Sequence, residues 1–500
     1  MFQPSAHQQR IFDWIARERG SAVVIARAGS GKSTTIVQSL RFIPEQMSVT
    51  IYAFNTAIAK EMSEKIDRLR QEVGRAFTKV QARTFHSVGY GVVRRYLEGK
   101  AAKIDVSSSK LRTICDGWLS EEDGRLYGSF ICKLVSLAKG QGIGPLTPDT
   151  EAAWWDLINH HDLVLESENA VEDRAVMLAR ELLQRSNERA KTGLIDYDDQ
   201  LYLVLLWKLR LYQVDWVFID EAQDTNPVRR ALAKLALRPG GRLVAVGDDR
   251  QAIYGFCGAT HDAIYLIERD FAAIRLPLTV SYRCARKIII EAQRIVPDIE
   301  AADGAEDGQI LHQTLNEALP RLTNRDAILC RNVAPLVSLL FKLIARNVPA
   351  KVLGRDFATN LISLVKNMRA SDIDRLQFRL SVWAAREIAR YTAKGEEQKA
   401  DGIEDRVACI NAVIDNLPED EYTIQGLTVK IEGLFSDENG VLMLSTVHKA
   451  KGREWDTVAV LDPWRMPSRW ARQDWQQRQE QNLIYVCQTR ARKTLMYLTD

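Results

Sequence analysis

Short apolar runs alternate along the chain with longer stretches in which apolar residues recur every three or four positions. The runs at 23–25, 49–54 and 216–219 are rich in β-branched and aromatic residues, which is typical of strands buried on both faces. Helical periodicity follows such runs, for example in 57–70. This alternation predicts parallel sheets joined by crossover helices.

Two long stretches have a helical pattern without strands, and they interrupt the alternation. We therefore predict an α/β fold with two doubly wound parallel sheets, each interrupted by a helical insertion. The first unit is expected at 1–87 and 191–273 with its insertion at 88–190, and the second at 274–369 and 439–500 with a shorter insertion at 370–438. The strands expected in the second unit are 276–280, 327–330, 441–444, 458–461 and 494–498.

A glycine-rich loop follows the first apolar run and leads into a helical pattern. Strand, glycine loop and helix form the geometry that binds a nucleotide phosphate, because backbone N–H groups and the helix N-terminus close around the phosphate oxygens. We expect Lys32 to reach the β- and γ-phosphates and the Ser33 hydroxyl to hold Mg²⁺. The expected phosphate-binding residues are Ala28, Gly29, Ser30, Gly31, Lys32, Ser33 and Thr34.

Two adjacent carboxylates, Asp220 and Glu221, follow the apolar run at 216–219. Asp220 suits Mg²⁺ coordination, and Glu221 suits the general base that orients and deprotonates the attacking water. Taken alone, the pair also fits a solvated helix start, where acids are favoured by the dipole. After the next strand, Gln251 is placed to sense the γ-phosphate, and Tyr254 and Phe256 share one face if the backbone there is extended.

Composition adds few constraints. A net charge of +3 neither requires nor excludes nucleic acid, because a local basic groove can exist within a nearly neutral total. The seven cysteines form no CxxC pair, so neither a disulfide framework nor a zinc ribbon is indicated, and a reducing cytoplasm fits. No signal pattern and no membrane-spanning run is visible. We expect a cytoplasmic protein without a membrane partner.

The motifs, in this order, resemble those of superfamily 1 DNA helicases of the UvrD/Rep/PcrA type, over nearly the whole chain. The matching segments are Gln8, 26–34, 54–57, 84–87, 220–224, 247–258, 281–283, 446–455 and 482–491. The resemblance implies two RecA-like domains with ATP and Mg²⁺ between them. It also implies specific roles: Gln8 would read the adenine, Tyr282 would stack on it, Glu454 would bind the ribose, and Arg283 and Arg490 would reach the γ-phosphate as arginine fingers.

The resemblance also implies a track for single-stranded DNA, with aromatic side chains as platforms for the bases. The expected contacts are Phe54, Asn55, Thr84, His86, Tyr254, Phe256, Thr446 and His448. Alternatives stay open: Phe54 and Phe256 fit core aromatics, and the two histidines fit satisfied buried side chains rather than contacts or metal ligands. Many relatives carry Trp at the position of Phe256 and Arg at that of Cys257.

The stretch 464–475 interleaves aromatic and basic residues, so it fits either a grip on a nucleic-acid backbone or plain packing. The short second insertion, and an end ten residues after Arg490, suggest a compact motor that needs a protein partner for processive unwinding.

The resulting hypothesis is an ATP-dependent translocase on single-stranded DNA that unwinds duplexes at their junctions with single strands, with 3′ to 5′ polarity. Two alternatives remain. One is a translocase that strips proteins from DNA without productive unwinding. The other is an ATP-gated DNA-binding subunit of a larger repair, defence or mobile-element complex. RNA as the track is a weaker option, because no motif residue reads the 2′-hydroxyl unambiguously.

Overall fold

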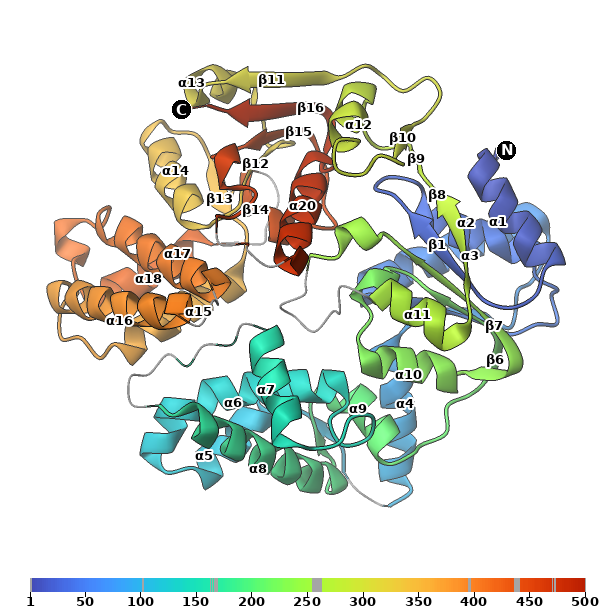
Figure 1. The fold of residues 1–500 in the computed structure, drawn as a ribbon, viewed down its shortest axis with the longest axis horizontal. Coiled ribbons are helices and arrows are strands. Elements are labelled where there is room, and N and C mark those ends of the chain that lie inside the picture. Colours follow the sequence, from blue (N-terminus) through green and yellow to red (C-terminus); the bar gives the residue numbers. More distant parts are fainter. Residues whose placement is uncertain are drawn as a thin grey trace. The chain divides into compact units, whose positions relative to one another are not determined.

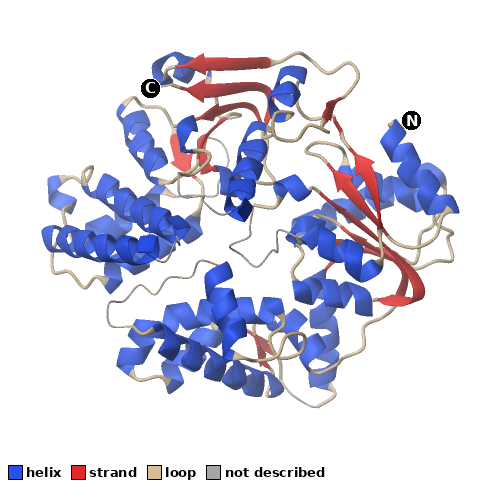
Figure 2. Cartoon of the chain, in the orientation of Figure 1, coloured by secondary structure: helices blue, strands red, loops and turns tan. Residues whose placement is uncertain are grey.

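A computed structural model describes residues 2–100, 103–161, 163, 165, 170–253, 263–393, 397–435, 441–469, 471 and 474–499. The chain divides into two compact units, Met1–Val280 and Ser281–Asp500. Each contains one large parallel sheet with helices beside it (Figures 1 and 2). The predicted fold class, two parallel α/β units, is therefore confirmed.

The sheet of the first unit has six parallel strands in the order β3-β2-β6-β7-β1-β8. Its strands are β1 (Ala22–Ala26), β2 (Val49–Ala53), β3 (Val80–Thr84), β6 (Val214–Ile219), β7 (Leu237–Gly247) and β8 (Ile274–Leu278). The helices connecting them are α1 (Ala6–Arg17), α2 (Lys32–Ser39), α3 (Thr56–Val73), α4 (Phe85–Glu98), α9 (Asp199–Leu206), α10 (Pro227–Leu235) and α11 (Ala263–Phe271).

Alternating residues of each strand face opposite sides of this sheet, as the period of two requires. Val24 and Ile51 belong to the core under α1, α2 and α3. Val23 and Tyr52, one position away, belong to a second core under α4, α10 and α11. The sheet is thus buried on both faces at its centre, which explains why β1, β2 and β6 are almost continuously apolar.

The expected boundary between the units at residue 274 is wrong. The segment Ile274–Leu278 pairs in parallel with β1 and forms the edge of the first sheet. The apolar run at 276–280 indicates a buried strand, but an apolar run alone does not show which sheet the strand joins. The division falls after Val280, inside β9 (Val280–Ser281), which pairs with β10 (Glu300–Ala301).

The insertion of the first unit is helical, as expected. It contains α5 (Lys110–Trp118), α6 (Glu121–Gln141), α7 (Glu151–His160) and α8 (Glu172–Lys191), closed by the short parallel pair β4 (Asp105–Val106) and β5 (Leu194–Ile195). A charged cluster is buried where these helices meet the segment before α9. The Lys110 and Lys139 ammonium groups lie 2.5 and 2.7 Å from the Asp199 carboxylate, and all three side chains are fully buried.

The second sheet is also parallel, in the order β11-β16-β15-β12-β14-β13. Its strands are β11 (Gln309–Gln313), β12 (Ala327–Cys330), β13 (Ala350–Val352), β14 (Leu442–Thr446), β15 (Trp455–Val460) and β16 (Ala491–Leu498). Its helices are α12 (Arg286–Ala292), α13 (Leu315–Ala318), α14 (Ala334–Ala345), α19 (Val447–Ala450) and α20 (Asp474–Gln488). The sequence did not predict β11 and β13, which are the two edge strands.

A second group of helices interrupts this unit between β13 and β14: α15 (Arg355–Asn367), α16 (Ile373–Ala393), α17 (Glu397–Ile414) and α18 (Ile424–Leu434). One contact ties α17 to the end of β12. The Asp405 carboxylate accepts hydrogen bonds from the backbone N–H groups of Val333 (2.9 Å) and Ala334 (3.0 Å), at the start of α14. Among the described residues, no helix is long and apolar enough to span a membrane.

We predict that Asp199→Ala lowers the free energy of unfolding of the helical insertion by roughly 3–5 kcal/mol, because two buried ammonium groups would lose a shared carboxylate. Amide hydrogen exchange in α6 measures this locally, since a chain of two units need not unfold in one step. The matched control is Arg174→Ala, which breaks the ion pair with Asp123 on the surface of the same insertion and should leave the free energy of unfolding nearly unchanged, because an exposed pair is screened by water. Equal losses in both variants would contradict the prediction.

Candidate functional site

The loop between β1 and α2 has the backbone of a phosphate cradle. Gly29 and Gly31 have φ angles of 73° and 80°, which L side chains rarely adopt, and Gly31 is the residue before the first turn of α2. The Ser30 hydroxyl is buried and has no hydrogen-bond partner among the described residues. Ser33 and Thr34 are half-buried on the first turn of α2. The N-terminus of α2 therefore offers N–H groups and one unused hydroxyl.

Lys32 pairs with Glu221, although 189 positions separate them in the sequence. The Lys32 ammonium lies 2.8 Å from Oε1 of Glu221. Burial alone would lower the pKa of Lys32, but the carboxylates of Glu221, Asp220 and Asp248 outweigh it and raise the pKa above its ordinary value. Lys32 is therefore a fixed positive charge between the ends of β1 and β6.

Asp220 ends β6 in an environment that opposes its negative charge. It is 5% exposed, and its Oδ1 has no hydrogen-bond partner among the described residues. Burial first, and then the adjacent Glu221, raise the pKa of Asp220 to about 7. Glu221 itself has a φ of 51°, a strained conformation for a residue with a side chain. Placing these two adjacent carboxylates together costs free energy, and a bound cation would offset that cost.

A second layer of polar residues supports these carboxylates. Gln223 donates to Glu221 (2.5 Å), and its own carbonyl oxygen accepts from the backbone N–H of Asp248 (3.0 Å). Asp248 is fully buried, pairs with Arg27 (2.9 Å) and accepts from the Gln251 amide (2.8 Å). Gln251 was expected from the sequence, whereas roles for Arg27, Gln223 and Asp248 were not. The one signal in the sequence that could have indicated them is Asp248, an acidic residue that follows an apolar strand.

Gln8 contacts the phosphate loop through α2. Its amide donates to the Thr35 hydroxyl (3.0 Å), and its carbonyl oxygen accepts from the backbone N–H of Ser5 (3.0 Å), which caps α1. The side chain is buried, at 3% exposure. The structure thus brings Gln8 to the nucleotide loop and anchors it from both ends of its amide.

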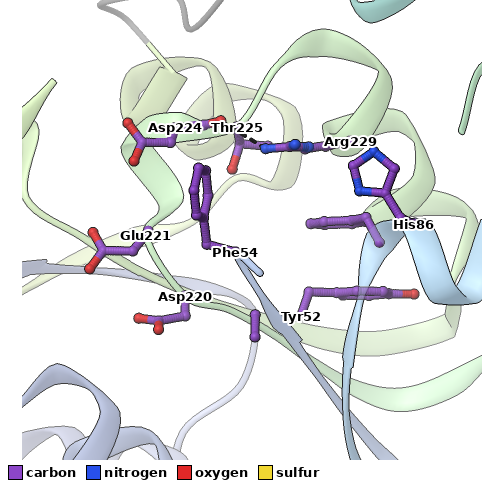
Figure 3. Close-up of a pocket in the computed structure, with 10 residues that line it drawn as sticks. Tyr52, Phe54, His86, Asp220, Glu221, Asp224, Thr225 and Arg229 are labelled. Carbon is purple, nitrogen blue, oxygen red and sulfur yellow. Dashed lines mark hydrogen bonds between the residues drawn. The ribbon is translucent and has the colours of Figure 1, made fainter. Parts of the chain in front are cut away.

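A pocket beside Asp220 and Glu221 contains aromatic residues from β2 and α4 (Figure 3). Asp220 and Glu221 point to one side of Phe54, and Arg229 and His86 lie on its other side. Phe54 is 42% exposed, so it is not a core residue, and the Arg229 guanidinium lies 5.7 Å from its ring centre. Sequence analysis missed Arg229. It lies on the first turn of α10, where no motif pointed to it.

The other residues of the first unit that were expected to contact DNA, Asn55 and Thr84, cap helices. The Asn55 side chain accepts from the Ile58 N–H at the start of α3, and the Thr84 hydroxyl accepts from the Ser87 N–H at the start of α4. Tyr254, Phe256 and Cys257 lie outside the described residues.

In the second unit, three charged residues of the motifs cluster with Arg492, which lies just outside the last motif. Glu454 pairs with Arg283 and with Arg492. Arg490 is 1% exposed and donates to the backbone carbonyls of Val486 and Arg453, each at 3.1 Å. Burial first, and then the neighbouring Arg283, lower the pKa of Arg490 to about 10. Tyr282, next to Arg283, is 56% exposed and so presents a free ring face.

Thr446 and His448 lie at the end of β14. The Thr446 hydroxyl accepts from the Lys449 N–H and caps α19. His448 is half-buried; burial and the nearby Arg331 lower its pKa to about 3, so the ring is neutral at pH 7. In the stretch 464–475, Trp464 is 60% exposed, which argues against a packing role for this residue, while Trp470 and Arg472 lie outside the described residues.

His86 provides a test of this pocket. Burial, and then the Arg229 charge, lower its pKa from 6.5 to about 4. Between these values the unfolded chain binds a proton that the folded chain does not, so the free energy of unfolding falls as the pH drops from 6.5 towards 4. We predict that His86→Gln loses this part of the pH dependence in urea unfolding. Parallel stability curves for both proteins across this range would contradict the assignment.

Comparisons with known proteins agree with this geometry. The model of the UvrD/REP helicase N-terminal domain matches residues 7–272, and that of the UvrD-like helicase C-terminal domain matches residues 161–499. The ATP-dependent DNA helicase Rep of Escherichia coli is 25% identical over 313 residues, covering 58% of this chain and 42% of that protein. DNA helicase II of Haemophilus influenzae is 27% identical over 301 residues, covering 56% and 39%.

F-box DNA helicase 1 of Gallus gallus is 23% identical over an alignment of 527 residues, covering 98% of this chain and 48% of that protein. The chain thus spans less than half the length of these relatives. Both family models together cover almost all of its residues. The chain belongs to the UvrD/Rep family of helicases.

Proposed function

We propose that this chain hydrolyses ATP to move along single-stranded DNA and to unwind duplexes with 3′ to 5′ polarity. The observation that carries the proposal is the shared pocket: the acids expected to act on the nucleotide, Asp220 and Glu221, line the same cavity as Phe54 and His86. A change at the nucleotide can therefore alter the grip on a base directly. The names of the relatives, which are DNA helicases, support DNA as the substrate.

The residues of the first unit fit a magnesium nucleotide. The buried Ser30 hydroxyl and the Oδ1 of Asp220 have no partner among the described residues, and the raised pKa of Asp220 falls when a cation comes near. In this proposal Ser33 and Asp220 hold Mg²⁺, and residues 28–34 hold the phosphates. The metal, when bound, neutralises charge that develops on the transferred phosphoryl group.

Glu221 is the proposed general base. Its ion pair with Lys32 keeps the carboxylate ionised, which a base requires before it can take a proton from water. A γ-phosphate would compete with Glu221 for the same ammonium group, so nucleotide binding would release Glu221 towards the water. Gln251, held by Asp248, lies one hydrogen bond away from this network and is proposed to sense the terminal phosphate.

The second unit is proposed to supply Arg283 and Arg490 as arginine fingers, Tyr282 as the surface that stacks on adenine, and Glu454 as the ribose contact. The clustering of Arg283 with Glu454 supports a shared role for these residues. In the first unit, Gln8 is proposed to read the adenine. Its fixed amide supports a positioned hydrogen-bonding group close to α2.

The proposed DNA track consists of Phe54, Asn55, Thr84, His86, Thr446 and His448, together with Tyr254 and Phe256, which the structure does not describe. Exposed Phe54 offers a ring face to a base, and neutral His86 and His448 offer hydrogen bonds without adding charge. Junctions of duplex and single strand are the proposed substrates, and a protein partner is proposed to raise processivity.

We predict that Lys32→Ala and Glu221→Gln abolish DNA-stimulated ATP hydrolysis, with a loss of about 10²–10⁴ for the glutamine variant. Binding of single-stranded DNA should stay largely intact, because neither residue belongs to the track. ATPase rates and fluorescence anisotropy measure the two properties separately. Lys191→Ala, an exposed lysine paired with Glu188 on α8, is the matched control and should behave like wild type. Robust turnover by either site variant would remove the assignment.

Polarity needs its own experiment. Strand displacement is measured on two duplexes that differ only in carrying a 3′ or a 5′ single-stranded tail. We predict ATP-dependent unwinding of the 3′-tailed duplex alone, and none by Lys32→Ala. Preference for the 5′ tail would refute the proposed polarity, and displacement of a bound protein without strand separation would refute the unwinding; both outcomes would leave the ATPase part standing.

A further inference from the structure

A second basic and aromatic groove lies on the first unit, away from the nucleotide loop. It is lined by the C-terminal half of α4 and by the segment that joins α9 to β6, two regions that pack together (Figure 1). The side chains that give it its chemistry are Arg95, Tyr96, Arg210 and Tyr212, with Lys100 beside them. We call these five residues the amino-edge patch.

The local backbone conformation exposes the side chains of this patch to solvent. Lys208, with a φ of 52°, reverses the chain after α9, and the Leu209 N–H donates to the Val204 carbonyl (2.8 Å). Leu211 is buried, so its neighbours Arg210 and Tyr212 point outward in the extended segment that follows. Tyr212 is 68% exposed, so its ring is accessible from solvent.

The charge of the patch is one-sided. No acidic side chain lines the groove among the described residues, and the nearest acid on the same helix, Glu98, pairs with Arg94 at 3.3 Å. The Lys100 ammonium lies 4.5 Å from the centre of the Tyr96 ring, and Tyr96 in turn packs against Trp207 at 4.9 Å. One aromatic ring is thus fixed in place, while Tyr212 remains accessible.

The patch is separate from the pocket that contains Phe54. It adjoins the amino end of β6 at Val214, whereas Asp220 follows the carboxyl end of the same strand. Six residue steps along a strand span about 20 Å, so one bound nucleotide cannot touch both places. None of the helicase motifs falls on the patch.

We propose that the amino-edge patch binds single-stranded DNA as a second contact, with phosphates on Arg95 and Arg210 and an unstacked base on Tyr212. Cations interleaved with accessible aromatic rings suit single strands, whose bases are free to stack, better than duplexes, whose bases are enclosed. The proposal goes beyond the proposed function and rests on it only in taking DNA as the nucleic acid.

The test compares wild type with Arg95→Ala/Arg210→Ala and with Tyr212→Ala, measuring binding of a long single strand, a blunt duplex and a strand too short to span both sites. The double variant should bind the long strand about tenfold more weakly, and the slope of log K against log salt should shrink by about 1.4, as expected for two lost phosphate contacts on a single strand. Binding of the short strand should change little. Arg17→Ala/Arg19→Ala, two exposed cations at the end of α1, removes the same charge elsewhere in this unit.

Binding is measured without nucleotide, so the outcome does not depend on ATP hydrolysis. Unchanged affinity and salt slope in the patch variants, an equal loss in the Arg17/Arg19 control, or a loss confined to the duplex would each overturn the proposal. If the patch variants bind single strands more weakly as predicted but the wild-type protein unwinds no duplex, the result would count against the proposed function alone. Thermal unfolding of Tyr212→Ala, whose exposed ring contributes little to packing, shows whether a loss of binding reflects contact rather than folding.

Discussion

The ion pair between Lys32 and Glu221 is the contact on which the first unit depends. It joins the ends of β1 and β6, two strands separated in the sheet by β7. Because all strands run in parallel, their carboxyl ends meet at one edge however much chain lies between them. A helical insertion can therefore sit between the two motifs without disturbing the site. The ammonium group also makes two adjacent acids tolerable in a place where burial opposes the charge of Asp220.

The same segment that holds the acids leads to the aromatic pocket. From Glu221 the chain makes one short turn and then enters α10, whose first turn carries Arg229. The turn is held rigidly: a Cβ on Gly247 would lie 2.5 Å from the Gln223 side-chain oxygen, and that oxygen accepts from Asp248. A shift of Glu221 would therefore be transmitted to Arg229 and Phe54 and not absorbed by the turn. This gives a physical reason why, in the proposed function, nucleotide binding and the contact with a base would change together.

Local patterns predicted the elements that carry their own signal. The β1 loop, the acids after β6 and the helical insertions followed from apolar periodicity, glycine spacing and charge placement. The features that the sequence did not predict depend on contacts between residues that are far apart in the chain. The segment Ile274–Leu278 looks like any buried strand, and only its register with β1 assigns it to the first sheet. Likewise Arg27, Gln223 and Arg229 are ordinary polar residues until the fold brings them to Asp248, Glu221 and Phe54.

The carboxylate of Asp405 has a consequence for how the two sheets differ. It already satisfies the first backbone donors of α14, the helix that follows β12. After β1, by contrast, the residue before α2 is Gly31, which has no side chain to cap the helix. An anion at the start of α14 would have to displace the Asp405 carboxylate. An anion at the start of α2 would instead meet backbone N–H groups that no side chain caps. The two units, alike in architecture, thus differ at the starts of these two helices, and one acid on an inserted helix makes that difference.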